Sequence, residues 1–149
     1  MFGTSGVRGR VGEDVTAALA LGVGRALATD GAGTVVVARD ARDSGRMLVR
    51  ALVAGLTECG ADVVDVGVEA TPTVARAVVR EGADAGVVVT ASHNPACDNG
   101  IKLWTASGRA FGEERNDRIA GIVETEAFDL AGHDAIGAVE TRDVVAGGD

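Results

Sequence analysis

Short apolar runs rich in β-branched residues alternate with longer helical patterns along this chain, and no other feature restricts its fold as strongly. Three such runs, at residues 34–38, 62–67 and 85–90, have the length and composition of buried strands. Helical patterns separate them, so each crossover is expected to bring the next strand back parallel to the last. The sequence therefore predicts an α/β fold with three layers, α/β/α, around a mostly parallel mixed sheet.

Polar residues and glycines mark the ends of the expected helices. Thr16 is expected to cap the first helix, Ser44 to open the second, and Thr71, followed by Pro72, to cap the third. A glycine follows each of these helices, as is common at helix carboxyl ends. The other expected elements are an extended segment at 2–11, strands at 101–105 and 139–145, and a helix at 113–125.

Gly22 and Gly24 have part of the spacing of a dinucleotide-binding fingerprint, but their context argues against that interpretation. The fingerprint must follow a strand and open a helix, whereas these glycines lie inside the first helical pattern. Close packing against another helix explains them instead.

Charge and composition argue against several classes of protein. The formal net charge is −8, whereas a nucleic-acid partner requires a basic face. No apolar run approaches the roughly 18–20 residues that span a bilayer, and no signal peptide opens the chain, so a cytoplasmic location without membrane contact is expected. Thirteen arginines stand against one lysine, Lys102, which is typical of a salt-adapted (halophilic) organism or of a GC-rich genome. Cys59 and Cys97 indicate neither a disulfide framework nor a zinc site.

Two loops expected at the carboxyl ends of strands, residues 39–45 and 90–100, carry groups suited to chemistry. Within and just beyond the second loop, a hydroxyl, an imidazole, two carboxamides and an amine are concentrated: Ser92, His93, Asn94, Asn99 and Lys102. A polar turn built on Asn-Pro and Asn-Gly would give the same residues. From the residues alone, a site for phosphate chemistry and a simple turn both remain open.

Three segments in order resemble the α-D-phosphohexomutases, a family that includes phosphoglucomutase, phosphomannomutase and phosphoglucosamine mutase. They are Phe2–Gly9, Arg39–Gly45 and Thr90–Lys102. The resemblance implies that residues 1–125 form the nucleophile domain of such an enzyme, and that 126–149 are a tail leading toward a second domain absent from this chain.

The resemblance also implies the chemistry. Ser92 would carry a phosphoryl group and exchange it with a hexose phosphate through a bisphosphorylated sugar, which moves phosphate between the 1- and 6-positions. Lys102 corresponds to the family's acid/base position and Arg8 to its active-site arginine. The cofactors implied are Mg²⁺, with the phosphate on Ser92 as one ligand and the remaining ligands outside this chain, and a glucose 1,6-bisphosphate-type activator that phosphorylates Ser92.

Other residues are expected to support this site. His93 and Asn94 would shape the loop or contact phosphate or sugar, and Thr4 and Ser5 would hydrogen-bond near the phosphoserine. A further group is expected to brace the loop through a salt-bridged turn and a helix cap: Asp40, Arg42 and Ser44. Ser5 favours a phosphomannomutase or phosphoglucomutase, since the phosphoglucosamine branch more often has Asp at that position.

Several parts of the family's active site have no counterpart in this sequence. The Asp-Gly-Asp-x-Asp-Arg metal loop, the sugar-recognition loop and the C-terminal phosphate-binding loop are absent. The isolated chain is therefore expected to be catalytically incomplete, with the remaining domains of the mutase as partners. The alternative is a non-catalytic phosphate-binding or scaffold module descended from such an enzyme. A metal-dependent phosphatase that uses Asp40 and Asp43 is a weaker third class.

Overall fold

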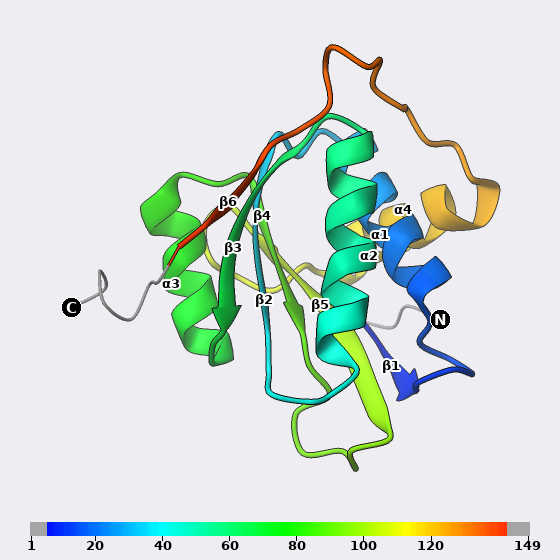
Figure 1. Cartoon of the computed structure of the whole chain (residues 1–149), viewed down its shortest axis with the longest axis vertical. Coiled ribbons are helices and arrows are strands. Elements are labelled where there is room, and N and C mark those ends of the chain that lie inside the picture. The colour runs from blue at the N-terminus through cyan, green and yellow to red at the C-terminus, as the bar shows by residue number, and fades with distance from the viewer. Residues whose placement is uncertain (1–5, 143–149) are drawn as a thin grey trace.

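The computed structural model describes residues 6–142, in which strands alternate with helices except for two consecutive strands at 85–89 and 98–105 (Figure 1). The strands are β1 (Val7–Arg10), β2 (Thr34–Arg39), β3 (Asp62–Val68), β4 (Ala85–Val89), β5 (Asp98–Thr105) and β6 (Val139–Thr141), and the helices are α1 (Ala17–Thr29), α2 (Gly45–Glu58), α3 (Thr71–Glu81) and α4 (Glu113–Thr125). The described strands form one sheet in the order β1-β5-β4-β2-β3-β6. The β2–β3, β2–β4 and β3–β6 pairs are parallel, and β1–β5 and β4–β5 are antiparallel.

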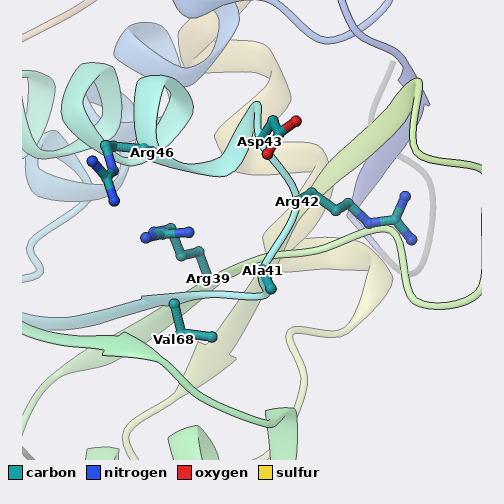
Figure 2. Close-up of a pocket in the computed structure, with 6 residues that line it drawn as sticks. All are labelled: Arg39, Ala41, Arg42, Asp43, Arg46 and Val68. Atoms are coloured by element: carbon teal, nitrogen blue, oxygen red, sulfur yellow. The ribbon is translucent and has the colours of Figure 1, made fainter.

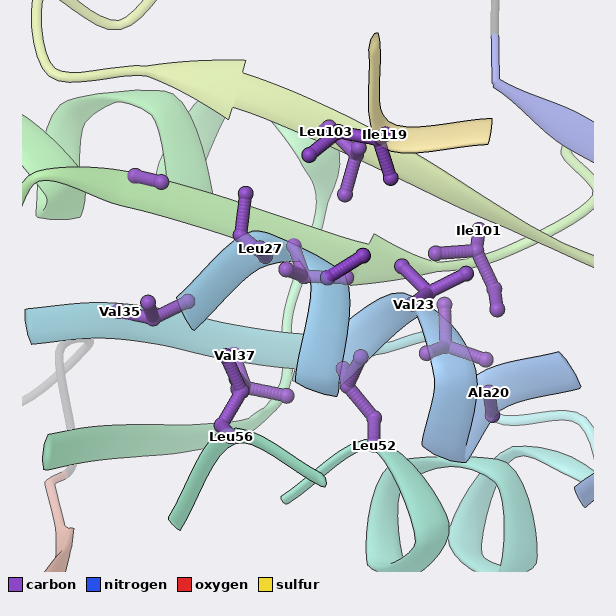
Figure 3. Close-up of a cluster of buried hydrophobic side chains, with 14 of the residues drawn as sticks. Ala20, Val23, Leu27, Val35, Val37, Leu52, Leu56, Ile101, Leu103 and Ile119 are labelled. Carbon is purple, nitrogen blue, oxygen red and sulfur yellow. The ribbon is translucent and has the colours of Figure 1, made fainter. Parts of the chain in front are cut away.

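The sheet has helices on both faces, which confirms the predicted three-layer fold. Alternate residues of β2 show the division: Val35 and Val37 belong to the core beneath α1, α2 and α4, whereas Val36 and Ala38 belong to the core beneath α3. Figure 3 shows the first of these cores, which aliphatic side chains fill. A central strand buried on both faces needs a continuous apolar run, as the sequence has at residues 34–38.

The helix starts agree with the predictions in part. Thr16 caps α1, since its hydroxyl accepts from the Leu19 N–H at 3.1 Å. Ser44 lies at the N-cap position of α2 as predicted, but its side chain makes no capping hydrogen bond. The cap of α3 is Ala70 rather than Thr71, because Ala70 is the last residue with extended backbone before the helix. None of the helices within residues 6–142 has both the length and the apolar composition needed to cross a bilayer.

β5 begins at Asp98, three residues earlier than predicted, and there it pairs with β1. Asp98, Asn99 and Gly100 have the composition of a turn, so the local sequence conceals this part of the strand. A Cβ atom at Gly100 would lie 2.6 Å from the carbonyl oxygen of Val7 and 2.8 Å from that of Thr90. Only glycine therefore lets β5 start so close to its neighbours.

The segment that follows α4 returns to the sheet. The Ala131 N–H donates to the Glu58 carbonyl at 2.9 Å, the Gly137 N–H donates to the Thr57 carbonyl at 3.0 Å, and β6 then pairs with β3. Up to residue 142 the expected tail thus forms an edge of this sheet. Of the strand predicted at 139–145, residues 139–141 are in β6 and 143–145 lie outside the described residues. A domain division at residue 125 remains a prediction.

Two glycines bring α1 and α2 together. A Cβ atom at Gly24 would collide with the carbonyl oxygen of Leu52, and one at Gly55 would collide with that of Leu21. Each helix thus lays its glycine against the backbone of the other. This contact confirms that close helix packing explains Gly24, while a Cβ atom at Gly22 would lie 3.3 Å from a Val123 methyl group of α4.

Alanine at Gly24 should destabilise the chain, because its methyl group has no space against the α2 backbone. We expect the free energy of unfolding to fall by about 1–3 kcal/mol, as for other overpacked cores. Gly121→Ala in α4 is the matched control, since its Cβ would meet nothing within 4 Å, and it should stabilise the chain by about 0.4–1 kcal/mol. Urea denaturation measures both. A Gly24→Ala chain as stable as the wild type would contradict the packing described.

Candidate functional site

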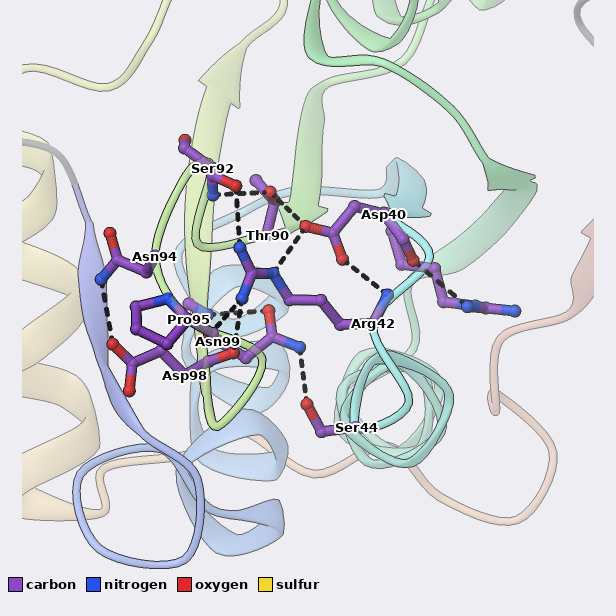
Figure 4. A network of polar contacts seen from close by, with 11 residues as sticks. Asp40, Arg42, Ser44, Thr90, Ser92, Asn94, Pro95, Asp98 and Asn99 are labelled. Carbon is purple, nitrogen blue, oxygen red and sulfur yellow. Dashed lines mark hydrogen bonds and ion pairs between the residues drawn. The ribbon is translucent and has the colours of Figure 1, made fainter.

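Two loops meet at the carboxyl edge of the sheet, one after β2 and one after β4 (Figure 4). β2 and β4 are parallel neighbours, with Arg39 opposite Val89 in the register. The Asp40 N–H donates to the Val89 carbonyl at 3.1 Å, so the first loop begins against the end of β4. This pairing places the segment after β2 beside the segment that carries Ser92.

Ser92 has an unusual backbone and an exposed side chain. Its φ of +56° lies in the left-handed region, which costs an L-residue about 1–2 kcal/mol. Its N–H donates to the Thr90 hydroxyl at 3.0 Å. Within residues 6–142 its own hydroxyl forms no hydrogen bond, and Figure 4 shows it directed away from the polar network. The surroundings therefore hold the backbone and leave the hydroxyl available.

The Arg42 guanidinium holds the loop around Ser92 through three carbonyl oxygens. Nη2 donates to the Ser92 carbonyl at 2.7 Å, and Nη1 donates to those of Pro95 at 2.6 Å and Asp98 at 3.2 Å. A planar, multiply donating guanidinium suits this arrangement better than an ammonium group would. The loop is thus fastened at its beginning, middle and end.

Asp40 orients both Arg42 and the start of the loop. Its Oδ2 accepts from Arg42 Nε at 3.1 Å and from the Thr90 hydroxyl at 2.6 Å, and its Oδ1 accepts from the Arg42 N–H at 3.1 Å. The Thr90 hydroxyl in turn accepts from the Ser92 N–H. A continuous hydrogen-bonded path therefore runs from the Asp40 carboxylate to the Ser92 backbone. Thr90, which was not among the predicted site residues, is the buried link in this path.

Ser44 joins the two loops a second time. Its hydroxyl accepts from the amide group of Asn99 at 2.9 Å, which explains why it makes no capping hydrogen bond within α2. Asn99 is fully buried, and its Oδ1 accepts from the Gly100 N–H at 2.9 Å. Asn99 was grouped with the polar residues of the Ser92 loop, and the structure gives it a supporting role, since it is buried at the start of β5.

Arg8 and Lys102 lie on adjacent strands and on one face of the sheet. Arg8 is opposite Gly100 in the β1–β5 register, and Lys102 is two residues further along β5. Lys102 is opposite Val88, which belongs to the core beneath α3, so the two cations share that face. Arg8 is exposed and Lys102 half-buried, and neither forms an ion pair within residues 6–142. The Thr90 N–H donates to the Gly100 carbonyl, so both cations flank the start of the Ser92 loop.

The remaining predicted residues differ in their surroundings. His93 is exposed, and Asn94 donates from its amide group to the Asp98 carboxylate at 3.1 Å. Asn94 therefore helps to close the loop on itself. Thr4 and Ser5 lie outside the described residues.

The donor set of this part of the chain does not complete a metal site. Within residues 6–142, no group of three or more His, Cys, Asp or Glu side chains gathers in one place. The Asp40 carboxylate already accepts three hydrogen bonds. Burial raises the pKa of the Cys59 thiol, which keeps it protonated and makes it a poor ligand. A phosphoryl group on Ser92 would offer only one ligand, so a bound Mg²⁺ would depend on residues outside this set.

Loss of the Arg42 guanidinium should loosen the Ser92 loop more than the sheet. In Arg42→Gln we expect amide hydrogen exchange of residues 91–98 to accelerate while that of β2 and β3 changes little, and stability to fall by about 2 kcal/mol, as typical for lost charge-assisted hydrogen bonds. Arg76→Gln, which removes an exposed arginine of α3, is the control. Equal exchange of the loop in wild type and Arg42→Gln would show that Arg42 does not hold it.

Comparison with known proteins identifies the family of this chain. Residues 1–130 match the family described as phosphoglucomutase/phosphomannomutase, alpha/beta/alpha domain I. A "probable phosphoglucosamine mutase" of Methanobrevibacter smithii is 42% identical over 149 residues, which cover 99% of this chain and 34% of that protein. The phosphoglucosamine mutase of Rhodococcus opacus is 47% identical, with 95% of this chain and 34% of that protein covered.

A solved structure supports the same assignment. The structure of a phosphoglucomutase/phosphomannomutase family protein from Burkholderia thailandensis matches with a TM-score of 0.86 and 34% identity, over 98% of this chain and 33% of that one. The chain thus spans about a third of the length of the relatives that it matches. It belongs to the phosphoglucomutase/phosphomannomutase family and corresponds to the first α/β/α domain of its members.

Proposed function

We propose that this chain supplies the phosphoryl-carrying serine of a phosphohexomutase, and that Ser92 is that serine. The observation that carries the proposal is the exposed Ser92 hydroxyl, which stands on a left-handed backbone held by Arg42 and Thr90. A strained residue held by its surroundings at a strand end is typical of a functional site. The reaction class is inferred from the family. We extend the proposal to the activity of the whole enzyme.

The transfer proceeds in two balanced steps. A hydroxyl of a hexose monophosphate attacks the phosphorus on Ser92, so the bond to the sugar oxygen forms as the bond to Ser92 Oγ breaks. The sugar hydroxyl loses a proton to a base, and the departing serine oxygen takes one up. The bisphosphorylated sugar then reorients in the site and returns its other phosphoryl group to Ser92. The net result is movement of phosphate between the 1- and 6-positions.

Arg8 and Lys102 bring positive charge to this transfer. Both lie on the strands that flank the loop, and no carboxylate of residues 6–142 neutralises either one. Cations fixed beside a transferring phosphoryl group stabilise the charge on its oxygens. Lys102 acts electrostatically, as the proton-transferring group, or as both. His93 and Asn94 contact phosphate or sugar, or shape the loop, and Thr4 and Ser5 approach the phosphoserine.

The metal ion, the activator, the cellular location and the substrate are inferred in the same way. Mg²⁺ would neutralise charge on the phosphoryl oxygens when bound, with the phosphate on Ser92 as this chain's one ligand and the remaining domains supplying the others. A glucose 1,6-bisphosphate-type activator would load Ser92, and the enzyme would act in the cytoplasm. The names of the M. smithii and R. opacus relatives favour glucosamine phosphate as the hexose phosphate, against the preference drawn from Ser5.

The competing functions receive less support. A non-catalytic module would not need an exposed serine, on a strained backbone, flanked by two cations without carboxylate partners. A metal-dependent phosphatase would need Asp40 and Asp43 free at a strand end. Asp40 is instead committed to Arg42 and Thr90 through three hydrogen bonds.

Phosphate should be found on Ser92. Mass spectrometry of the chain after incubation with glucose 1,6-bisphosphate and the remaining domains should locate one phosphoryl group on the peptide that contains Ser92. Ser92→Ala should abolish both this modification and the turnover of the full-length enzyme. Full activity of the Ser92→Ala enzyme would show that the carrier is another residue.

Removal of the Lys102 ammonium should reduce turnover with little effect on folding. In the full-length enzyme, Lys102→Met should lower kcat by about 100-fold or more, whereas stability should change by less than about 1 kcal/mol. Lys102→Arg separates the two roles: it restores kcat if the charge alone matters and does not if the group transfers a proton. A loss of stability that matches the loss of activity would indicate a structural role.

A further inference from the structure

A cavity of about 450 Å³ opens at the carboxyl ends of β2 and β3 (Figure 2). This volume is in the range of small-molecule sites. It is lined by Arg39, Ala41, Arg42, Asp43, Arg46 and Val68. The cavity thus lies beside the loop that holds Ser92 in place, but none of the residues of the Ser92 loop lines it.

Two guanidinium groups face this cavity from different elements. Figure 2 shows Arg39, at the end of β2, and Arg46, in the first turn of α2, directed into the same space, whereas Arg42 extends the other way toward the Ser92 loop. Within residues 6–142 neither Arg39 nor Arg46 forms an ion pair, and the neighbouring Asp43 carboxylate pairs with neither. Arg39 donates only to the Asp40 carbonyl, at 3.2 Å. Two positive charges therefore face one cavity without a carboxylate partner.

This arrangement favours a doubly charged oxyanion. Two guanidinium groups that share a cavity repel each other. Such a pair is unexpected in a chain of net charge −8 unless an anion binds between them. A phosphate monoester carries a charge of about −1.5 to −2 at neutral pH and has enough oxygens to accept from both guanidinium groups, although the Asp43 carboxylate that also lines the cavity lowers the net positive charge there. Guanidinium groups also bind phosphate oxygens through paired N–H donors. The exposed Val68 side chain adds an apolar wall for the carbon portion of a ligand.

We propose that this cavity, named here the Arg39–Arg46 cavity, binds the phosphate monoester of a small molecule. The site is separate from phosphoryl transfer at Ser92, because Arg39 and Arg46, whose guanidinium groups face it, form no hydrogen bond to the Ser92 loop in the part of the chain that the structure describes. Arg42 connects the two, since it lines the cavity with its stem and holds the Ser92 loop with its guanidinium.

Methyl phosphate is the simplest probe of this site. We expect the NMR signals of the Arg39 and Arg46 Nε–H groups of the 149-residue chain to shift together as methyl phosphate is added at constant ionic strength. Inorganic phosphate should shift the same signals. Acetate, a single-charged carboxylate, should shift them only at much higher concentration.

A matched pair of variants tests the contacts. Arg46→Gln should weaken methyl phosphate binding by about tenfold or more, because it removes a charge-assisted hydrogen bond to the phosphate. Arg50→Gln removes an exposed arginine one turn further along α2 and should leave the affinity unchanged. Arg46 is also exposed, so both variants should keep the wild-type unfolding midpoint in phosphate-free buffer.

Three outcomes would overturn the proposal. The Arg39 and Arg46 signals could remain still up to saturating probe, which would show that no anion binds. Arg50→Gln could weaken binding as much as Arg46→Gln, which would indicate a diffuse charge effect. Acetate could bind as tightly as methyl phosphate, which would make the cavity a carboxylate site. Unchanged binding by Ser92→Ala would support a site that works independently of Ser92.

Discussion

The hydrogen bonds of the Arg42 guanidinium are the interaction on which the candidate site depends. They fasten three carbonyl oxygens of the Ser92 loop, while the Asp40 carboxylate fixes the guanidinium itself. A left-handed serine costs free energy, and these bonds, with the one from the Ser92 N–H to Thr90, offset that cost. The serine hydroxyl can then face outward while its backbone stays fixed, which is the arrangement that a transferable phosphoryl group requires.

The position of Arg42 depends in turn on the core. The parallel pairing of β2 with β4 sets the two loops side by side, and both strands are buried between helices. α2 begins at Gly45, directly after the loop that carries Arg42, and packs on α1 through Gly24 and Gly55. The polar network thus depends on the glycine contact between α1 and α2 and on the apolar layers of the core. This dependence explains how this domain holds the Ser92 backbone in a defined geometry.

Much of this fold could be predicted because local sequence patterns indicate most of its strands and helices. The β-branched runs at 34–38, 62–67 and 85–90 form β2, β3 and β4, since strands buried on both faces need such runs. The start of β5 could not be predicted, because Asp98 to Gly100 resembles a turn and becomes a strand only through pairing with β1. The hydrogen-bond partner of the Ser44 hydroxyl could not be predicted for a related reason, since Asn99 lies 55 positions further along the chain.

The candidate site, too, could be predicted only in part. Family resemblance drew attention to Ser92, but no local rule indicates that this serine adopts a left-handed backbone, which is more usual for Gly or Asn. Thr90 resembled the last residue of an apolar strand, and its role as the link from Asp40 to Ser92 depends on contacts across the sheet.

The most direct test of the account is a single-turnover experiment with full-length enzyme labelled with ³²P on Ser92. After mixing with excess unlabelled hexose phosphate, the label should leave Ser92 and appear in sugar phosphate at least as fast as kcat. Label that stays on Ser92 while turnover proceeds would contradict the central claim.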